Sequence, residues 1–281
     1  MRAAVADAWS ASAEAYAATW APRFAPWVST AVAALRGEAA RARPSPPPGP
    51  LLDLGCGPGH ELAALASAFP GRRLVARDAA PGMVRLASAR AGPGVTVEVD
   101  DARAVGYQPS ILFSAFLLQA MPARAAALTA WVAALPPGGL AGVLWWPSPA
   151  AQPDVAWAAV TAGPPDGGSD EGNTPAGVAA AAAAGGGAVL LDENPVHMLC
   201  FASRAALADA LLKGGPLTVA AAVDPAAAAE LATAAAALAE TDPEGTGGGG
   251  VFLRPSARLV VVRKGLGRGV GGGDPAPAPR L

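Results

Sequence analysis

The amino-acid sequence predicts an α/β fold in which a mostly parallel sheet is covered by helices on both faces. Between residues 51 and 146, short apolar runs alternate with stretches of helical periodicity. Repeated strand–helix units of this kind form a sheet of parallel strands with helices packed on it. The 281 residues are 52% hydrophobic, which is enough for a substantial buried core.

The elements of this core follow from its apolar runs and its proline and glycine positions. Strands are expected at 51–54, 74–76, 95–99, 111–114 and 140–146, and helices at 60–69, 81–90 and 122–135. Pro81 suits the first turn of its helix, and Pro136-Pro137-Gly138-Gly139 ends the helix before the fifth strand.

The chain before the first strand is predicted to be a helical cap over residues 1–43. Residues 7–35 show helical periodicity, with Trp20, Phe24 and Trp27 at helical spacing. Pro22 and Pro26 are expected to divide this stretch into two helices. Residues 44–50 are rich in proline and predict a stiff linker to a domain that spans 51–264.

After Pro147 the strand–helix alternation becomes irregular. Residues 163–187 are rich in Gly, Ala and Pro and predict an irregular insertion with a loose Ala-rich helix. The remaining expected elements are a strand-like run at 194–201, helices at 203–212 and 225–240, and a last strand at 259–262. Asp224 and Pro225 favour a helix start there. Residues 265–281 are expected to be a disordered tail.

Charge and cysteine content exclude several classes of function. The net charge is -2 and no Lys/Arg run occurs, so neither nucleic-acid binding nor a polybasic membrane anchor is expected. No apolar run is long enough to span a bilayer. Cys56 and Cys200 are too few for a disulfide framework, and no metal-ligand cluster is evident. With no signal-peptide pattern in the first 20 residues, a cytoplasmic location is expected, with organelle import left open.

The strongest local motif is Asp53-Leu54-Gly55-Cys56-Gly57-Pro58-Gly59, which ends the first strand and opens a helix. Glycines there permit a tight turn and a close approach of the backbone to a ligand. His60 stands where a dinucleotide-binding loop has its third glycine, and no GK[ST] follows, so neither a dinucleotide loop nor a P-loop fits. Asp53 would repel a pyrophosphate but suits a ligand that carries an ammonium and a sulfonium.

Two further acidic positions follow at strand ends. Asp78 ends the second strand, where a carboxylate can accept both ribose hydroxyls of an adenosine. Asp100-Asp101-Ala102 ends the third strand, beside the expected adenine. All of these positions lie at the carboxyl ends of neighbouring strands, which is where open α/β sheets bind ligands.

These motifs make residues 7–146 resemble a class I S-adenosylmethionine-dependent methyltransferase, of the ubiquinone/menaquinone-methyltransferase-like (type 11) subgroup. The matching segments are Trp9 with Ala13-Glu14-Ala15-Tyr16, the loop at 51–59, Asp78 with Met83, Asp101-Ala102, and 135–139. The run at 258–263 resembles the last strand of that family. The resemblance implies a Rossmann-like, seven-stranded, mostly parallel sheet with an N-terminal helical cap.

The resemblance also implies a role for each matching residue. The methionine part of the cofactor would be lined by Asp53, Gly55, Cys56, Gly57 and Gly59. Asp78 would bind the ribose, with Ala79 and Met83 flanking the ribose and the adenine, and Asp101 and Ala102 at the adenine edge. Residues 114–119, including Gln119, would close the far side, and Tyr16 would cover the bound cofactor.

Several of these residues have plainer interpretations. Met83 also suits a helix core, and Asp100 could replace Asp101. Cys56 could have a lowered thiol pKa at a helix start, or could contribute only its backbone.

The sequence departs from the family pattern at four places. Ala80 replaces a helix-capping Ser, and Arg77 stands before Asp78 where an apolar residue is usual. Ser110 replaces an Asp that enters the fourth strand, and Gln119-Ala120 replaces a His-His pair.

The function expected from these observations is methyl transfer to a small-molecule acceptor by in-line displacement. The alternative is a non-catalytic S-adenosylmethionine-binding assembly or regulatory protein of the same fold; a nicotinamide oxidoreductase is disfavoured by His60 and Asp53. The chemistry needs no metal. His197 is the candidate general base for the acceptor, and the alternative for it is a strand-end histidine bonded to backbone.

Overall fold

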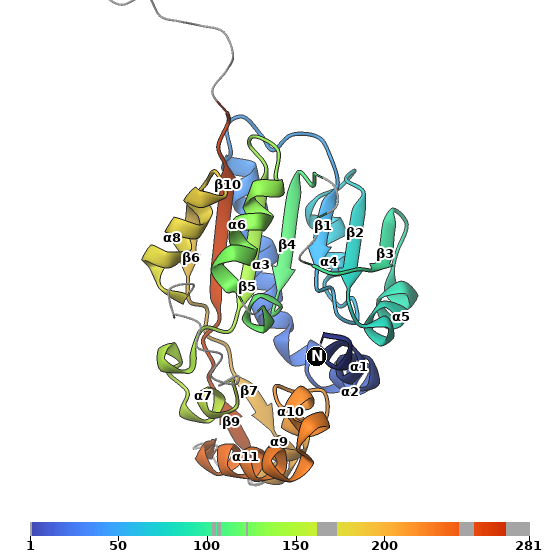
Figure 1. Ribbon diagram of the computed structural model, residues 1–281, viewed down its shortest axis with the longest axis vertical. Coiled ribbons are helices and arrows are strands. Elements are labelled where there is room, and N and C mark those ends of the chain that lie inside the picture. Colours follow the sequence, from blue (N-terminus) through green and yellow to red (C-terminus); the bar gives the residue numbers. More distant parts are fainter. Residues whose placement is uncertain are drawn as a thin grey trace, which may run out of the picture.

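The core of the structure, a computed structural model, is a seven-stranded sheet in the order β3-β2-β1-β4-β5-β10-β6 (Figure 1). The structure describes residues 2–102, 105, 108–121, 123–161, 173–241 and 250–267. The strands are β1 (Leu51–Leu54), β2 (Leu74–Asp78), β3 (Val95–Val99), β4 (Ile111–Ala115), β5 (Leu140–Trp145), β6 (Gly187–Glu193) and β10 (Arg258–Lys264). The first five are parallel, and β10 runs antiparallel to both β5 and β6. The predicted Rossmann-like, mostly parallel sheet is therefore confirmed.

Helices cover both faces of this sheet, as predicted. One face packs against α3 (Ala21–Arg41), α4 (Leu62–Ala68) and α5 (Pro81–Arg90), and the other against α6 (Arg124–Ala134) and α8 (Pro175–Ala184). Alternate strand residues divide between the two cores: Leu51 and Ile111 belong to the first, while Leu52 and Leu112 belong to the second. This follows from the two-residue period of a strand, and it places Asp53 on the α3 and α4 side.

The N-terminal cap consists of α1 (Arg2–Ala11), α2 (Ala13–Thr19) and α3. Pro22 lies in the first turn of α3, where its missing N–H costs nothing. The expected division at Pro26 is wrong, because α3 continues through this residue to Arg41. The buried side chains of Phe24 and Trp27 flank Pro26, and we attribute the continuous helix to their packing, which outweighs one lost backbone hydrogen bond.

The other core helices and strands begin and end within two residues of their expected bounds. The edge strand β6 escaped prediction because its first residue lies inside the Gly- and Ala-rich stretch at 163–187. Of the strand-like run at 194–201, only β7 (Leu199–Phe201) is a strand. Most of the 163–187 insertion before α8, and the tail from residue 268, lie outside the described residues.

Residues after Pro147, including the expected helices at 203–212 and 225–240, build a small lobe beyond the carboxyl ends of the parallel strands (Figure 1). Its antiparallel sheet has the order β7-β9-β8, with β9 at Val251–Leu253 and β8 at Glu240–Thr241. Its helices are α7 (Val155–Thr161), α9 (Arg204–Leu212), α10 (Thr218–Val223) and α11 (Pro225–Leu238), and 3-10 turns occur at Leu118–Ala120 (η1) and Pro149–Ala151 (η2). The expected cap of α11 is present, since Asp224 accepts the Ala227 N–H at 3.1 Å.

Buried tryptophans join the N-terminal cap to this lobe. The Trp20 indole donates to the Ala210 carbonyl at 2.9 Å, and the Trp27 indole donates to the Pro195 carbonyl at 3.0 Å. Both indoles are fully buried. The cap and the lobe therefore lie together at the edge of the sheet where the ligand-binding loops are expected.

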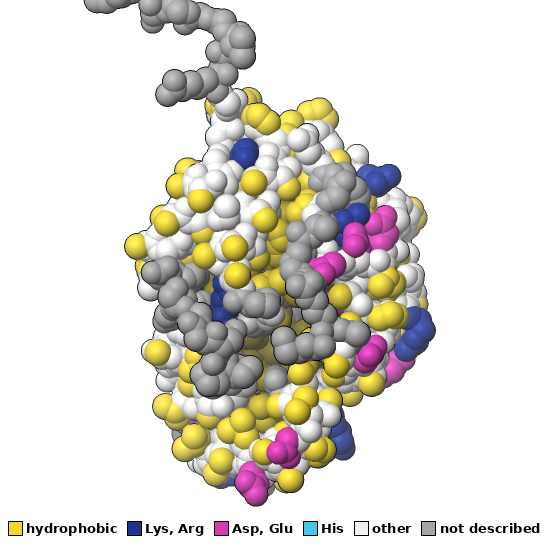
Figure 2. Space-filling model, in the orientation of Figure 1, with side chains coloured by type: hydrophobic (Ala, Val, Ile, Leu, Met, Phe, Trp, Pro, Cys, Tyr) yellow, Lys and Arg dark blue, Asp and Glu magenta, His cyan; other side chains and the backbone are white. Residues whose placement is uncertain are grey.

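The surface bears few charges. Figure 2 shows Lys and Arg side chains scattered singly or in pairs on one face, without a continuous basic patch. Among the described helices, none is both long and apolar enough to cross a membrane. The described residues also contain no cluster of three or more His, Cys, Asp or Glu side chains that could hold a metal ion.

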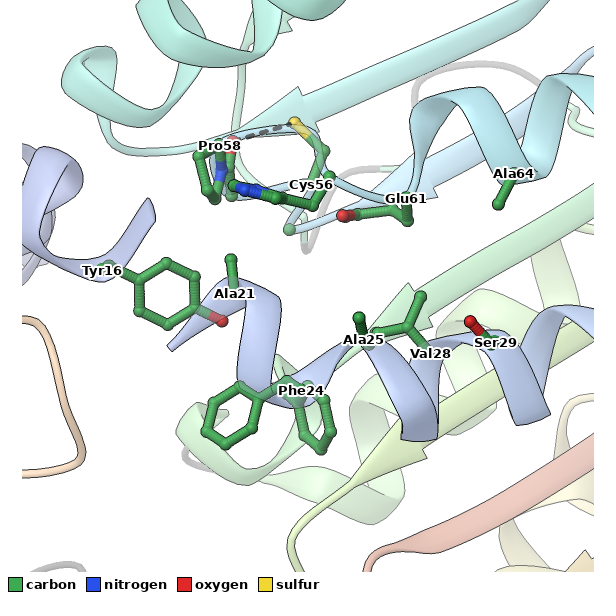
Figure 3. A pocket seen from close by; sticks show the side chains of 15 residues that line it. Tyr16, Ala21, Phe24, Ala25, Val28, Ser29, Cys56, Pro58, Glu61 and Ala64 are labelled. Carbon is green, nitrogen blue, oxygen red and sulfur yellow. Dashed lines mark hydrogen bonds between the residues drawn. The ribbon is translucent and has the colours of Figure 1, made fainter. Parts of the chain in front are cut away.

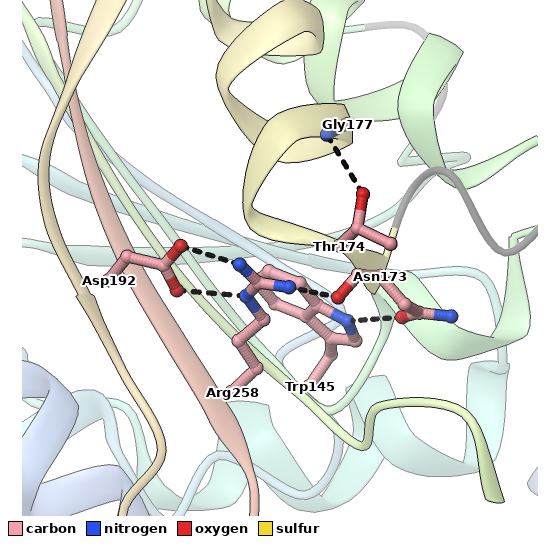
Figure 4. Close-up of polar contacts among 6 residues, drawn as sticks. All are labelled: Trp145, Asn173, Thr174, Gly177, Asp192 and Arg258. Carbon is pink, nitrogen blue, oxygen red and sulfur yellow. Dashed lines mark hydrogen bonds and ion pairs between the residues drawn. The ribbon is translucent and has the colours of Figure 1, made fainter. Parts of the chain in front are cut away.

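A buried ion pair joins the last two strands of the sheet (Figure 4). Arg258 of β10 is 4% exposed and contacts both carboxylate oxygens of Asp192 on β6, at 2.8 and 2.5 Å. Arg258 also donates to the Asn173 carbonyl, and the Trp145 indole donates to the Asn173 Oδ1 at 3.1 Å. One guanidinium thus links β6 and β10 to the segment before α8.

Replacing Asp192 should destabilise the sheet edge, because it leaves a buried guanidinium without its counter-charge. We expect Asp192→Asn to lower the free energy of unfolding by about 2–3 kcal/mol in urea titration. Asp209→Asn is the matched control, since it breaks the exposed ion pair with Lys213, and it should cost about 0.5 kcal/mol or less. Equal losses in the two variants would contradict the structural role of the buried pair.

Candidate functional site

The loop between β1 and α4 turns sharply at three glycines. Gly55, Gly57 and Gly59 have φ angles of +72°, +50° and +78°, a region that side-chain-bearing residues rarely adopt. The Gly57 N–H donates to the Asp78 carboxylate at 2.9 Å, which joins the loop to the end of β2. The parallel pairing of β1 with β2 therefore places the loop and Asp78 at one edge of the sheet.

The three glycines differ in what lies beside them. A Cβ on Gly55 would approach Leu117 to 2.8 Å, and one on Gly59 would approach the Ala87 Cα to 2.9 Å, so protein packing alone requires these two glycines. A Cβ on Gly57 would meet only the Tyr16 ring, at 3.9 Å. The space above Gly57 is therefore open, as a ligand-binding loop requires.

Both carboxylate oxygens of Asp78 accept hydrogen bonds from backbone N–H groups. Besides the Gly57 N–H, it accepts the N–H of Ala80, the residue that precedes α5, at 2.8 Å. Burial raises the pKa of the Asp78 carboxyl, and these hydrogen bonds oppose the rise. Each oxygen keeps a second lone pair that could accept a hydroxyl. Beside Asp78, Ala79 is exposed, whereas Met83 is buried against Ala13 and Ala17 of the cap.

Arg77 forms an ion pair with Asp100, one of the two acids that follow the third strand. Its guanidinium contacts Glu98 at 3.0 Å and Asp100 at 2.9 Å, so the unusual residue before Asp78 is a partner for the third strand. The Asp101 N–H donates to the Asp100 carboxylate. Ala102 is buried, and its carbonyl accepts the Trp131 indole N–H at 2.9 Å, so this carbonyl already has a partner on α6.

Two carboxyl groups adjoin beneath the glycine loop. Asp53 is fully buried, and neither of its side-chain oxygens accepts an N–H group among the described residues, but its carboxyl shares a hydrogen bond with the carboxyl of Glu61. Burial, the Glu61 carboxyl and Asp78 raise the pKa of Asp53 well above its ordinary range. Burial also raises the pKa of Glu61 to about 7. The Cys56 thiol pKa is raised by burial and by these acids, so the lowered thiol pKa considered for Cys56 is wrong.

A cavity lies between the loop and the N-terminal helices (Figure 3). The α3 helix contributes Ala25, Val28 and Ser29, and Glu61 projects into the cavity from the opposite side. Tyr16 also lines the cavity. Burial, together with the nearby carboxyl groups of Glu61 and Asp78, raises the pKa of the Tyr16 phenol, so the hydroxyl stays protonated.

Aromatic residues form the end of the cavity near β4. Phe116 follows β4 with a φ of +56°, an uncommon conformation for an aromatic residue, and such conformations cluster at functional sites. Its ring stacks on Trp146 with 4.5 Å between centroids and packs against Phe24 at 4.9 Å. Gln119 donates to the Phe116 carbonyl at 2.7 Å, while its Oε1 is buried without a partner among the described residues.

Ser110 lies at the opposite edge of the sheet. It precedes β4, and its hydroxyl donates to the Pro50 carbonyl and accepts from Arg72. This departure from the family pattern is therefore remote from the glycine loop.

His197 is not brought to the cavity. Its Nε2 lies 3.2 Å from the Thr30 hydroxyl, and its ring packs edge-on against Trp27 at 4.9 Å. Both partners are on α3, on a side different from the cavity-lining Ala25 and Val28. The arrangement does not support His197 as the base for an acceptor in the cavity, and its partner is a side-chain hydroxyl rather than the expected backbone group.

The sequence motifs did not indicate Glu61 or the α3 side of the cavity. Glu61 stands two residues after Gly59, so its place at the helix start was the available signal. The α3 contacts had no such signal, since they depend on how a distant helix packs on the sheet.

Comparison with known proteins agrees with this geometry. Residues 51–139 match the family model of a methyltransferase domain. The chain is 35% identical over 98 residues to the trans-aconitate 2-methyltransferase of Methylobacterium nodulans, covering 34% of this chain and 38% of that protein. The chain thus spans only about a third of the length of the curated relatives it matches.

Solved structures share the fold. The YcgJ protein of Bacillus subtilis superposes with a TM-score of 0.54 at 14% identity, covering 84% of this chain and 98% of that one. A methyltransferase candidate from Bacillus halodurans gives a TM-score of 0.52 at 14% identity, covering 83% and 98%. These structures show the fold alone, and the family match over residues 51–139 supports the predicted class I methyltransferase domain with S-adenosylmethionine as its cofactor.

The open space at Gly57 predicts a selective loss of binding. We expect Gly57→Val to abolish S-adenosylhomocysteine binding in calorimetry, because a β-branched side chain would occupy the ligand's space. Gly71→Val is the matched control, because Gly71 also has a left-handed φ, of +80°, and its Cβ would meet nothing within 4 Å. If both variants bind like the wild type, the loop is only a turn.

The raised pKa of Glu61 predicts a pH-dependent stability. Because the folded state holds the proton up to about pH 7, against an ordinary pKa of 4.5, this group makes the unfolding free energy fall as pH rises between those values. The Glu61→Gln variant has no carboxyl to ionise at this position, so it lacks this fall in unfolding free energy. In thermal denaturation of the ligand-free protein, the variant should therefore gain more stability over wild type at pH 8 than at pH 5. Exposed Glu230→Gln should show no such trend, and an equal gain at both pH values for Glu61→Gln would contradict the pKa assignment.

Proposed function

We propose that this chain is an S-adenosylmethionine-dependent methyltransferase that transfers a methyl group to a small-molecule acceptor by in-line displacement. The observation that carries the proposal is the open space over Gly57, a loop residue whose N–H donates to the Asp78 carboxylate at the end of the neighbouring strand. The methyltransferase family match over this segment supports it, and neither comparison favours the alternative of a non-catalytic binding protein.

In this proposal the cofactor lies along the carboxyl ends of β1 to β4. Asp78 accepts the ribose hydroxyls, and Asp101 with Ala102 meets the adenine. The remaining contacts are Ala79 and Met83 beside the ribose, the loop residues Asp53, Gly55, Cys56, Gly57 and Gly59 at the amino-acid end, Gln119 beyond β4, and Tyr16 as a cover. Only Gly57 among the loop glycines has space for direct contact at its α carbon.

Positioning supplies most of the catalysis in this proposal. Bound S-adenosylmethionine supplies a methyl group on a sulfonium, which an acceptor atom displaces. The chain's part is to hold donor and acceptor in line and exclude water, and such positioning can contribute roughly 7–11 kcal/mol. Tyr16, Phe24 and Phe116 line the cavity, and aromatic rings attract cations such as a sulfonium through their faces.

The cavity suggests which acceptors fit. A polycarboxylate would need basic partners, yet no Lys or Arg is among the described residues that line the cavity, and Glu61 adds a carboxyl. We therefore infer a neutral or cationic acceptor for this chain, whereas the matched relatives are named for trans-aconitate. The cytoplasmic location stays a prediction.

The proposal is tested by binding and by transfer. Asp78→Ala should weaken S-adenosylhomocysteine binding by about 1.5–3 kcal/mol, the range for hydrogen bonds to a charged group. Exposed Asp209→Ala is the control and should bind like wild type. Unchanged affinity in Asp78→Ala would reject the ribose assignment.

Wild-type protein should then be screened with tritiated-methyl S-adenosylmethionine against amines, phenols, quinones and acids. We expect label to pass to an amine or a neutral acceptor. Binding without transfer to any class would favour the non-catalytic alternative, and transfer only to acids would contradict the acceptor inference.

A further inference from the structure

An aromatic wall closes the end of the cavity near β4, and Phe116 is its most accessible member. Phe116 and Phe24 both line the cavity, and Trp146 packs against both of them. Phe24 and Trp146 are each only 5% exposed, whereas Phe116 is half-buried. Phe116 is therefore the wall residue that keeps surface for a ligand.

One face of the Phe116 ring is already covered by protein. Its plane lies 19° from that of Trp146, with 4.5 Å between the centroids. Trp146 is held in turn by edge-to-face contacts with Trp27 and Trp157, at 5.4 and 5.0 Å. A ligand in the cavity can thus meet the Phe116 ring only at its opposite face or at its edge. A flat ring on that opposite face would continue the stack, in the offset geometry that aromatic pairs prefer.

The backbone holds this ring in a conformation that a bulky residue rarely adopts. Phe116 has a φ of +56°. Its N–H donates to the Leu144 carbonyl at 2.7 Å, and its carbonyl accepts the Gln119 side-chain amide at 2.7 Å. Glycine would make the same turn without strain, so the turn by itself does not explain a phenylalanine. Strained residues of this kind cluster at ligand sites, which directs attention to the ring.

The turn after β4 adjoins the glycine loop. β4 pairs in parallel with β1, and Phe113 lies opposite Asp53. A Cβ on Gly55 would come within 2.8 Å of Leu117, the residue after Phe116. Because the loop and Phe116 line one cavity, a molecule resting on the Phe116 ring would lie beside a ligand held by the loop. Transfer between two bound molecules needs this proximity.

We propose that Phe116 is a specificity-determining residue for the methyl acceptor, and that its ring, backed by Trp146, selects acceptors with a flat unsaturated ring over saturated ones. The inference rests on the proposed function and deepens it, because it narrows the neutral or cationic acceptor to one that carries a planar ring. Phe116 forms no bond to the acceptor; it contributes contact area and orientation.

The test compares two neutral alcohols that differ in their rings. Benzyl alcohol has a flat ring, and cyclohexylmethanol has a puckered one that is more apolar, so burial alone would favour the saturated compound. Ligand-observed NMR titrations would use protein saturated with S-adenosylhomocysteine, which measures binding without transfer. Wild-type protein should bind benzyl alcohol about three- to tenfold more tightly, as expected for a stacked aromatic pair. Equal binding of the two alcohols, or binding of neither, overturns the role of Phe116.

Substitutions assign the preference to the ring. Phe116→Leu keeps an apolar side chain in the same backbone conformation but lacks the flat ring, so its two affinities should lie within about twofold of each other. Phe116→Tyr keeps a flat ring and should keep the preference. Phe252→Leu is the matched control, because Phe252 is a buried phenylalanine of β9 that packs with Arg254 in the lobe. An undiminished preference in Phe116→Leu, or an equal loss in Phe252→Leu, would contradict the assignment.

Calorimetry with S-adenosylhomocysteine separates this inference from the proposed function. If wild-type protein does not bind S-adenosylhomocysteine, the proposed function fails and the inference falls with it. If it binds and the titrations show no preference for the flat ring, the role of Phe116 is overturned while the proposed function stands.

Discussion

The hydrogen bond from the Gly57 N–H to the Asp78 carboxylate is the contact on which the site depends. It joins the turn after β1 to the end of β2, and it forms only because these strands pair in parallel register. The same carboxylate also accepts the N–H of Ala80, the residue that precedes α5. One side chain thus sets the loop and the next helix, while the open α carbon of Gly57 faces the cavity.

The N-terminal cap completes the site from a distant part of the sequence. Its aromatic side chains bind it to both parts of the molecule: Phe24 packs on Phe116 and Trp146 at the sheet edge, and Trp20 bonds to the lobe. Besides Phe24, α3 presents the smaller side chains of Ala25, Val28 and Ser29 to the cavity. The cavity is therefore largely apolar on the cap side, and Glu61 makes it acidic on the loop side.

The distribution of charge separates structural ion pairs from site groups. Arg258 with Asp192, and Arg77 with Glu98 and Asp100, hold strands together at positions away from the loop. Asp53 and Glu61 have no such partner in the described structure, and burial keeps their pKa values high. Acids that the fold does not neutralise lie at the place where a cationic cofactor is proposed to bind.

The sequence by itself determined the strand–helix core, the glycine loop and the acids at the strand ends, because apolar periodicity and turn residues act over short stretches of chain. It also indicated the α11 cap at Asp224. Only the tertiary structure decided that α3 runs through Pro26, that Glu61 faces Asp53, and that His197 packs on Trp27 instead of lining the cavity. These outcomes depend on contacts between residues far apart in the chain, and local sequence patterns do not indicate which helix face will pack against which strand.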